Sequence, residues 1–180
     1  RYAALVQEAK MVPIVEPEVL MDGDHTIDKC YNVTSRVLDE CYKELSKHNV
    51  NLKGTVLKPN MILPGKDCKQ KTSTEEIAKK TLECIKKNMP SEVPGVAFLS
   101  GGQSELEATK NLNEINKIND TSFNFTFSYG RALQQSALKT WAKSMKDTDK
   151  IQKVFNHRAE MNGASTNAKW DEKLDQSFAA

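Results

Sequence analysis

One lysine stands where a short β-prone run ends. Lys58 follows the apolar and β-branched residues 55–57 and precedes Pro59. Proline donates no backbone N–H and pushes the preceding residue into extended geometry, so we expect a strand over residues 54–58 that ends at the lysine. Partial burial disfavours the charged form of a lysine, and the neutral amine is the form that attacks a carbonyl carbon to make a Schiff base. The pattern therefore predicts a covalent role for Lys58, with a solvated lysine at a strand end as the alternative.

Two carboxylates occupy the corresponding place in an earlier segment. Glu16 closes an expected strand over residues 11–16, Pro17 ends that strand, and Glu18 follows. If the two strands are parallel neighbours, these carboxylates lie on the same rim as Lys58. A carboxyl group beside an imine-forming lysine moves protons while the carbinolamine forms and loses water. Ion pairing with lysines of the rim is the alternative interpretation.

Glycine-containing turns follow the two later strands. Ser100-Gly101-Gly102 leads into one helix, and Ser128-Tyr129-Gly130-Arg131 leads into another. Backbone N–H groups of such a turn at a helix N-terminus bind anions, and an arginine adds bidentate contacts to a phosphate. The pair of turns predicts a phosphate site, although either segment alone is also typical of a flexible turn.

The histidines do not form a metal-binding pattern. His25, His48 and His157 are far apart, and none is spaced from another His or Cys as zinc ligands are. The acidic segment 22–25 is explained by a turn followed by a helix N-cap at Asp24. We therefore expect no metal site and no cofactor.

Four strands, each followed by an amphipathic helix, must position these side chains. Strand–helix units joined by right-handed crossovers give parallel sheets. Functional turns after every strand favour an α/β fold of the (β/α)8 TIM barrel type, and a small doubly wound sheet is the alternative. The expected strands are 11–16, 54–58, 96–100 and 125–128. The first helix is expected over 24–48 and the fourth over 132–141. The second begins at the capping box Ser73-x-x-Glu76 and the third at the capping box Ser104-x-x-Glu107.

The two ends of the chain are expected to differ. A helix over residues 1–10 precedes the first strand, and its start in mid-helix without a methionine suggests a piece of something longer. A polar break at 143–150 separates the last unit from a final helix over 151–161. Residues 162–180 have little apolar content and are expected to be irregular.

Composition narrows the function classes. The chain has 180 residues, 38% hydrophobic and 28% charged, with a net charge of +2, so it carries no electrostatic footprint for nucleic acid. No apolar run approaches the roughly 20 residues of a transmembrane helix, and the N-terminus does not read as a signal peptide. Four cysteines without paired spacing favour a reduced, cytoplasmic protein.

Taken together, the motifs resemble class I fructose-bisphosphate aldolase. The resemblance covers residues 1 to about 143, in the order and approximate spacing of that family. It rests on Val12-Pro13-Ile14-Val15-Glu16-Pro17-Glu18-Val19-Leu20, Asp22-Gly23-Asp24-His25, Leu57-Lys58-Pro59-Asn60-Met61, Phe98-Leu99-Ser100-Gly101-Gly102-Gln103-Ser104 and Phe127-Ser128-Tyr129-Gly130-Arg131-Ala132-Leu133-Gln134.

The resemblance implies a metal-independent lyase of glycolysis and gluconeogenesis that cleaves fructose 1,6-bisphosphate to dihydroxyacetone phosphate and glyceraldehyde 3-phosphate. Lys58 would be the Schiff-base lysine and Glu16 the proton shuttle, with Glu18 nearby. Family members are usually homotetrameric. The residues implied to hold the ketose phosphate are Leu99, Ser100, Gly101, Ser128, Gly130 and Arg131.

Two departures from the family pattern shape the expectation. The family chain is about twice as long, so residues 1–161 would supply the C-terminal half of a barrel, with a tail over 162–180. The aspartate, further lysines and arginine of the family's first half have no counterpart here, nor has its final tyrosine, because the chain ends at Ala180. We expect a missing N-terminal half as partner. An inactive half barrel that binds cytoskeletal or other protein partners, or another Schiff-base aldolase of sugar phosphates, are the alternatives.

Overall fold

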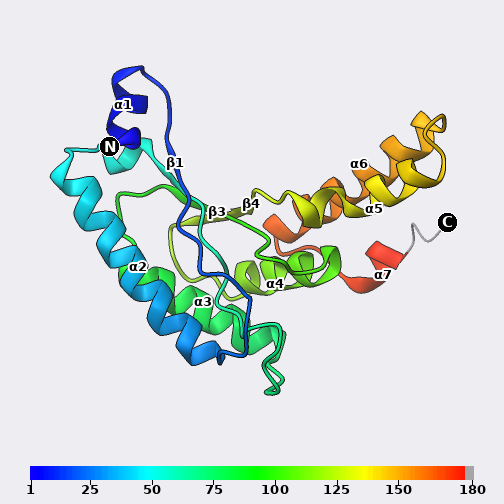
Figure 1. Cartoon of the computed structure of the whole chain (residues 1–180), viewed down its shortest axis with the longest axis horizontal. Helices are drawn as coiled ribbons and strands as arrows, with labels where there is room; N and C mark the ends of the chain where they lie inside the picture. Colours follow the sequence, from blue (N-terminus) through cyan, green and yellow to red (C-terminus); the bar gives the residue numbers. More distant parts are fainter. Residues whose placement is uncertain (177–180) are drawn as a thin grey trace.

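The structure is a computed structural model that describes residues 1–176. Four strands form one parallel sheet in the order β1-β2-β3-β4, so every crossover returns beside the strand before it (Figure 1). The four predicted strands and their parallel arrangement are confirmed, although β1 and β2 are shorter than predicted and β3 ends at Phe98 instead of residue 100. Their bounds are Ile14–Val15 for β1, Val56–Leu57 for β2, Gly95–Phe98 for β3 and Asn124–Phe127 for β4.

Three helices cover one face of this sheet. α2 is Ile27–Lys47, α3 is Thr74–Asn88 and α4 is Glu105–Lys117, and Figure 1 shows them on the same side of the strands. Apolar residues recur every three or four positions in each helix and form a stripe toward the sheet. Burial of each large side chain contributes about 1.5–3 kcal/mol. The resulting core includes Leu38, Leu57, Ile85, Phe98, Leu112 and Phe125.

The opposite face of the sheet is open at β1. Val15 is buried against a small cluster that includes Ala3 of α1 (Tyr2–Glu8), so its neighbour Ile14 points to the other face and is 50% exposed. Val12, on the same side, is 61% exposed. Within the described residues, β1 and β4 each lack a strand on their outer side. The chain thus folds as part of a barrel, with one face of the sheet covered by helices.

The start of α2 corrects one expectation. Asp24 was the predicted N-cap, but the cap is Thr26, whose Oγ1 accepts the backbone N–H of Lys29 at 3.3 Å. An N-cap oxygen must reach an N–H two or three residues ahead, and Asp24 lies two residues too early for this helix.

The two predicted capping boxes differ. Ser104 and Glu107 of α4 form the complete box, with both reciprocal hydrogen bonds, as predicted. At α3 the structure shows one half: Ser73 Oγ accepts the backbone N–H of Glu76 at 3.2 Å.

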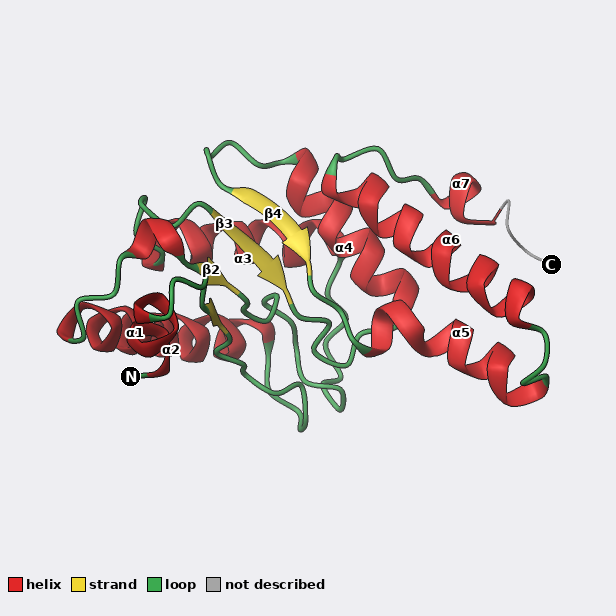
Figure 2. Ribbon diagram, turned by 90° about the horizontal axis from the view of Figure 1, so that it is seen from above, coloured by secondary structure: helices red, strands yellow, loops and turns green. Residues whose placement is uncertain are grey.

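The C-terminal region contains more helix than predicted. α5 (Arg131–Lys143) and α6 (Thr148–Thr166) lie side by side beyond the end of β4 (Figure 2), and α7 (Glu172–Gln176) follows. The expected irregular tail over 162–180 is therefore wrong for residues 162–166 and 172–176, while residues 177–180 lie outside the described part. The predicted last helix, 151–161, begins three residues too late and ends five residues too early.

Polar contacts with α4 explain why α6 continues. Asn162 is fully buried, and its Oδ1 accepts the hydroxyl of Thr109 at 3.0 Å. Asn116 Nδ2 donates to the carbonyl of the buried Ser165 at 3.2 Å. Sequence periodicity detects faces made of apolar residues. It therefore missed the face of α6 that polar residues such as Asn162 and Ser165 bury through hydrogen bonds.

Residues 1–176 contain no helix that is long and apolar enough to cross a membrane. Cys30, Cys41, Cys68 and Cys84 are free.

Candidate active site

The predicted site residues lie at the carboxyl ends of the four strands. Backbone hydrogen bonds continue the ladder just past the strand ends: Lys58 N–H donates to the Val15 carbonyl at 2.7 Å, Leu99 N–H to the Pro59 carbonyl at 3.0 Å, and the Ser128 N–H to the carbonyl at the end of β3 at 2.9 Å. Because parallel strands end at the same edge, the four segments lie along one edge of the sheet, each beside the segment that follows the adjacent strand. The three hydrogen bonds join chain positions that are 43, 40 and 30 residues apart.

The amine and the carboxylate predicted to share a rim do meet. Lys58 Nζ lies 3.0 Å from Glu16 Oε1, with the two side chains 20% and 49% exposed. Register explains the contact, since Val15 pairs with Leu57 and the next residue of each strand is therefore adjacent. The pair holds a proton donor or acceptor within hydrogen-bond reach of an amine, which is the geometry that proton transfer requires.

Glu18 takes a different place. Its side chain is exposed, and no ion pair joins its carboxylate to any residue within 1–176. Only Glu16, of the two predicted carboxylates, contacts Lys58.

The turn after β3 uses glycine for its backbone conformation. Gly101 and Gly102 have φ of +58° and +85°, in the left-handed region that favours glycine. Leu99 and Ser100 are both 6% exposed. The Ser100 carbonyl accepts hydrogen bonds from Gln103 N–H and Nε2, each at 3.0 Å, which closes the turn. These hydrogen bonds hold the turn at the carboxyl edge of the sheet.

The helix behind that turn carries its own negative charges. Glu107 Oε2 accepts the Ser104 backbone N–H at 2.9 Å, and the Glu105 carboxylate accepts the Ser136 N–H at 3.0 Å. Carboxylates in the first turn offset the positive end of a helix dipole. The N-terminus of α4 thus offers less to an external anion than the sequence indicated.

The turn after β4 is built differently. Gly130 is the N-cap of α5, no side chain caps this helix, and its first turn contains no acidic residue. Arg131 is the first helical residue and is exposed. Tyr129 is buried, its hydroxyl donates to the Ala108 carbonyl at 3.1 Å, and burial raises its pKa. Ser128, half-buried, lies beside them. Free helical N–H groups and a guanidinium give this turn the stronger anion-binding character.

Lys66 is a residue that the sequence did not indicate. A Cβ built on Gly102 would lie 3.2 Å from Lys66 Nζ, so the amine rests against the turn after β3. The same amine is 3.8 Å from Asp22 Oδ1. Nothing in the spacing of the loop after Pro64 indicated where this lysine points, because loop direction depends on tertiary packing.

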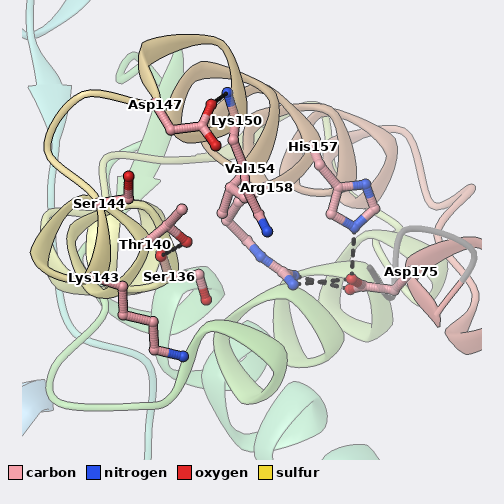
Figure 3. A pocket seen from close by; sticks show the side chains of 10 residues that line it. All are labelled: Ser136, Thr140, Lys143, Ser144, Asp147, Lys150, Val154, His157, Arg158 and Asp175. Atoms are coloured by element: carbon pink, nitrogen blue, oxygen red, sulfur yellow. Dashed lines mark hydrogen bonds and ion pairs between the residues drawn. The ribbon is translucent and has the colours of Figure 1, made fainter.

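The hollow between α5, α6 and α7 is a separate feature. It is a cavity of about 450 Å3 lined by residues of these helices and of the α5–α6 connection, and by none of the predicted site residues. Figure 3 shows Asp175 bridging Arg158 and His157 there, with Arg158 Nη1 at 2.8 Å and His157 Nε2 at 3.1 Å. Burial raises the pKa of Asp175, but the hydrogen bonds from Arg158, Trp170 and His157 outweigh it, and the net pKa is lowered. This cluster fastens α7 to α6.

Within residues 1–176, no group of three or more His, Cys, Asp and Glu side chains is arranged to hold a metal ion.

Comparisons with known proteins identify the family that this chain matches. The profile of the family Glycolytic, described as fructose-bisphosphate aldolase class-I, matches residues 1–180. Fructose-bisphosphate aldolase 4, cytosolic, from Arabidopsis thaliana is 54% identical over 167 residues, which is 92% of this chain and 42% of the relative. Fructose-bisphosphate aldolase C from Rattus norvegicus is 49% identical over 181 residues, which is 100% of this chain and 50% of the relative.

A solved structure agrees with the sequence comparisons. Fructose-bisphosphate aldolase from Plasmodium falciparum, solved in a complex with TRAP and a small-molecule inhibitor, superimposes with a TM-score of 0.91 at 45% identity. The match covers 94% of this chain and 49% of that one. The chain thus spans about half the length of the relatives that it matches.

Proposed function

The chain belongs to the class I fructose-bisphosphate aldolases, and from that premise we propose that it supplies the C-terminal half of a barrel that cleaves fructose 1,6-bisphosphate. The products are dihydroxyacetone phosphate and glyceraldehyde 3-phosphate. The observation that carries the proposal is the contact of 3.0 Å between Lys58 Nζ and Glu16 Oε1 at the carboxyl ends of β1 and β2.

In the proposed reaction Lys58 acts as the nucleophile. Its neutral amine attacks the ketose carbonyl carbon to give a carbinolamine, and loss of water then leaves a protonated imine. A base removes the proton of the hydroxyl on the carbon that will become the aldehyde, and a carbon–oxygen double bond forms there. The electron pair of the breaking carbon–carbon bond moves into the imine, the aldehyde product leaves, and an enamine remains. Protonation of the enamine carbon and hydrolysis release the ketone product and restore the amine.

Glu16 is the proposed proton shuttle. Formation of the imine requires a proton for the departing hydroxyl, and its hydrolysis requires a base for water; a carboxyl group within hydrogen-bond reach of the amine serves both steps. Glu18 is exposed on the same segment. In the proposal it becomes part of the site when the second half of the barrel packs against this edge.

The ketose phosphate is proposed to bind at the two glycine turns. The left-handed backbone of Gly101 turns the chain sharply after Leu99 and Ser100, and the uncapped N-terminus of α5 supplies free N–H groups at Gly130. Arg131 adds a guanidinium that matches a phosphate bidentately, and Ser128 adds a hydroxyl beside it.

We propose that a second set of four strand–helix units closes this sheet into an eight-stranded barrel, and we call the product the completed barrel. The proposal is supported by the exposure of Val12 and Ile14 on the sheet face without helices and by the unpaired outer sides of β1 and β4. An exposed apolar face and open strand edges promote association. We further propose that the completed barrel forms a homotetramer and that it is cytosolic; the name of the Arabidopsis relative, which includes the word cytosolic, supports the location.

Trapping the imine tests the catalytic role. The completed barrel is mixed with dihydroxyacetone phosphate, reduced with borohydride, digested and mapped by mass spectrometry. The expected result is a single labelled residue, Lys58, and activity that survives prolonged dialysis against EDTA. A label on another lysine would overturn the assignment, as would a loss of cleavage that zinc restores.

Binding of protein partners is a second candidate function, favoured by one observation. The Plasmodium falciparum relative was solved with TRAP bound. If the completed barrel gives neither imine nor cleavage, a scaffold role becomes the better account of the chain.

A further inference from the structure

The loop after β1 is tied at both of its ends to the segment that carries Lys58. At one end, the Val15 carbonyl accepts the Lys58 backbone N–H at 2.7 Å. At the other end, the Val19 backbone N–H donates to the side-chain Oδ1 of Asn60 at 2.9 Å. Residues 16–18, which carry both carboxylates, are therefore held between two anchors on the same neighbouring segment.

A side chain provides the second anchor because the backbone cannot. In a parallel ladder alternate N–H groups of a strand donate to its neighbour, and after Val15 the next such group would belong to residue 17. That residue is Pro17, which has no N–H, so the ladder stops there. The Asn60 side chain takes over the pairing two residues later, where it receives the N–H of Val19.

The side-chain amide of Asn60 is buried, and both its oxygen and its nitrogen form hydrogen bonds. The residue is 3% exposed. Its Nδ2 donates to the Met61 carbonyl at 3.0 Å and lies 3.2 Å from the Thr34 hydroxyl of α2. The orientation of the amide follows from these partners, since the Val19 N–H needs an acceptor and the Met61 carbonyl needs a donor. Asn60 thus joins the β1 loop, the β2 loop and α2.

We propose that Asn60 is a positioning residue that sets the contact between Glu16 and Lys58. The inference rests on the proposed function and names what holds its two reacting side chains in place. Without the amide, the loop keeps its hydrogen bond at Val15 and the packing of Val19 on the core but loses the hydrogen bond at the Val19 N–H. The Glu16 carboxylate, 49% exposed, then moves away from the amine. Phosphate binding is affected little, because the glycine turns follow β3 and β4.

The test uses Asn60→Ala in the completed barrel, with Asn88→Ala as the matched control. Asn88 is also an asparagine that ties a segment to α2: its Nδ2 lies 3.1 Å from Ser35 Oγ and donates to the Cys84 carbonyl at 2.7 Å. It sits at the end of α3, away from the carboxyl ends of the strands. Steady-state kinetics, the rate of borohydride-trapped imine and thermal unfolding are measured for both variants.

The expected result is a separation of kcat from KM. For Asn60→Ala, kcat and the trapping rate fall together by roughly tenfold to a hundredfold, the range that misplaced reacting groups produce, while KM changes much less. Asn88→Ala lowers the unfolding temperature but keeps kcat. If Asn60→Ala does not fold, Asn60→Leu fills the same space without an acceptor and must show the same kcat loss.

Each outcome bears on one hypothesis. If the unsubstituted protein yields no adduct at Lys58, the proposed function is wrong. If it yields the adduct and the position 60 variants trap imine at the unsubstituted rate, or lose kcat no more than Asn88→Ala does, Asn60 is a structural residue only and the inference is overturned.

Discussion

The turns after β3 and β4 resemble each other in sequence and differ in what they offer a phosphate. Both place a serine and a glycine between a strand end and a helix N-terminus. The turn after β3 needs positive φ at Gly101 and leads into a helix whose first turn is occupied by its own carboxylates. The turn after β4 has ordinary φ at Gly130 and leads into a helix with no side-chain cap.

The difference teaches that a glycine turn alone does not define an anion site. What counts is whether the helical N–H groups behind it are still free and which charges surround them. By that criterion we expect the turn after β4 to dominate the affinity of the proposed phosphate site, and the turn after β3 mainly to shape that site. Three substitutions test this ranking.

The largest effect is expected for Arg131→Ala. Loss of a charge-assisted contact costs about 1.5–3 kcal/mol, or roughly ten- to more than a hundredfold in affinity. Binding of dihydroxyacetone phosphate to the completed barrel, measured by calorimetry, checks this. Arg131→Lys should recover only part of the loss, because an ammonium cannot bind bidentately. Lys143→Ala, at the other end of α5, is the control, and equal affinity loss in both variants would contradict the ranking.

A smaller effect is expected for Gly101→Ala. A left-handed φ costs an L-residue about 1–2 kcal/mol, and the new Cβ would lie 3.4 Å from Leu99 Cδ1. The free energy of unfolding should fall by that amount in a denaturant titration. Gly130→Ala, with no atom within 4 Å of the new Cβ, should cost less. Gly163→Ala, inside α6 and also in open space, should be neutral or stabilising, since alanine favours helix. Equal destabilisation by all three would remove the distinction between the turns.

The smallest effect is expected for Glu105→Gln, which removes a negative charge from the first turn of α4. Helix-end charges are worth about 0.3–1 kcal/mol, so phosphate affinity should rise by a few-fold at low ionic strength and less in high salt. A glutamine oxygen can still accept the Ser136 N–H. Glu114→Gln, near the C-terminal end of the same helix, is the control. Unchanged affinity in Glu105→Gln at low salt would show that α4 does not influence the phosphate.

Much of the structure of the sheet edge that carries the candidate site could be predicted from the sequence. Pro17 and Pro59 mark strand ends because the loss of an N–H is a local property. The strand–helix repeat predicted parallel neighbours, which brought Glu16 to Lys58. These predictions succeeded because each depends on a few consecutive residues and on the chirality of crossovers.

Long-range polar pairing was decided only by the tertiary structure. Asn60 reaches Val19 across 41 positions, and Asn162 reaches Thr109 across 53, and neither pairing has a local signal. The same cause lies behind one error of element bounds, the continuation of α6 past Met161. A polar side chain reads as exposed in a sequence, and only the fold shows whether a buried partner satisfies it.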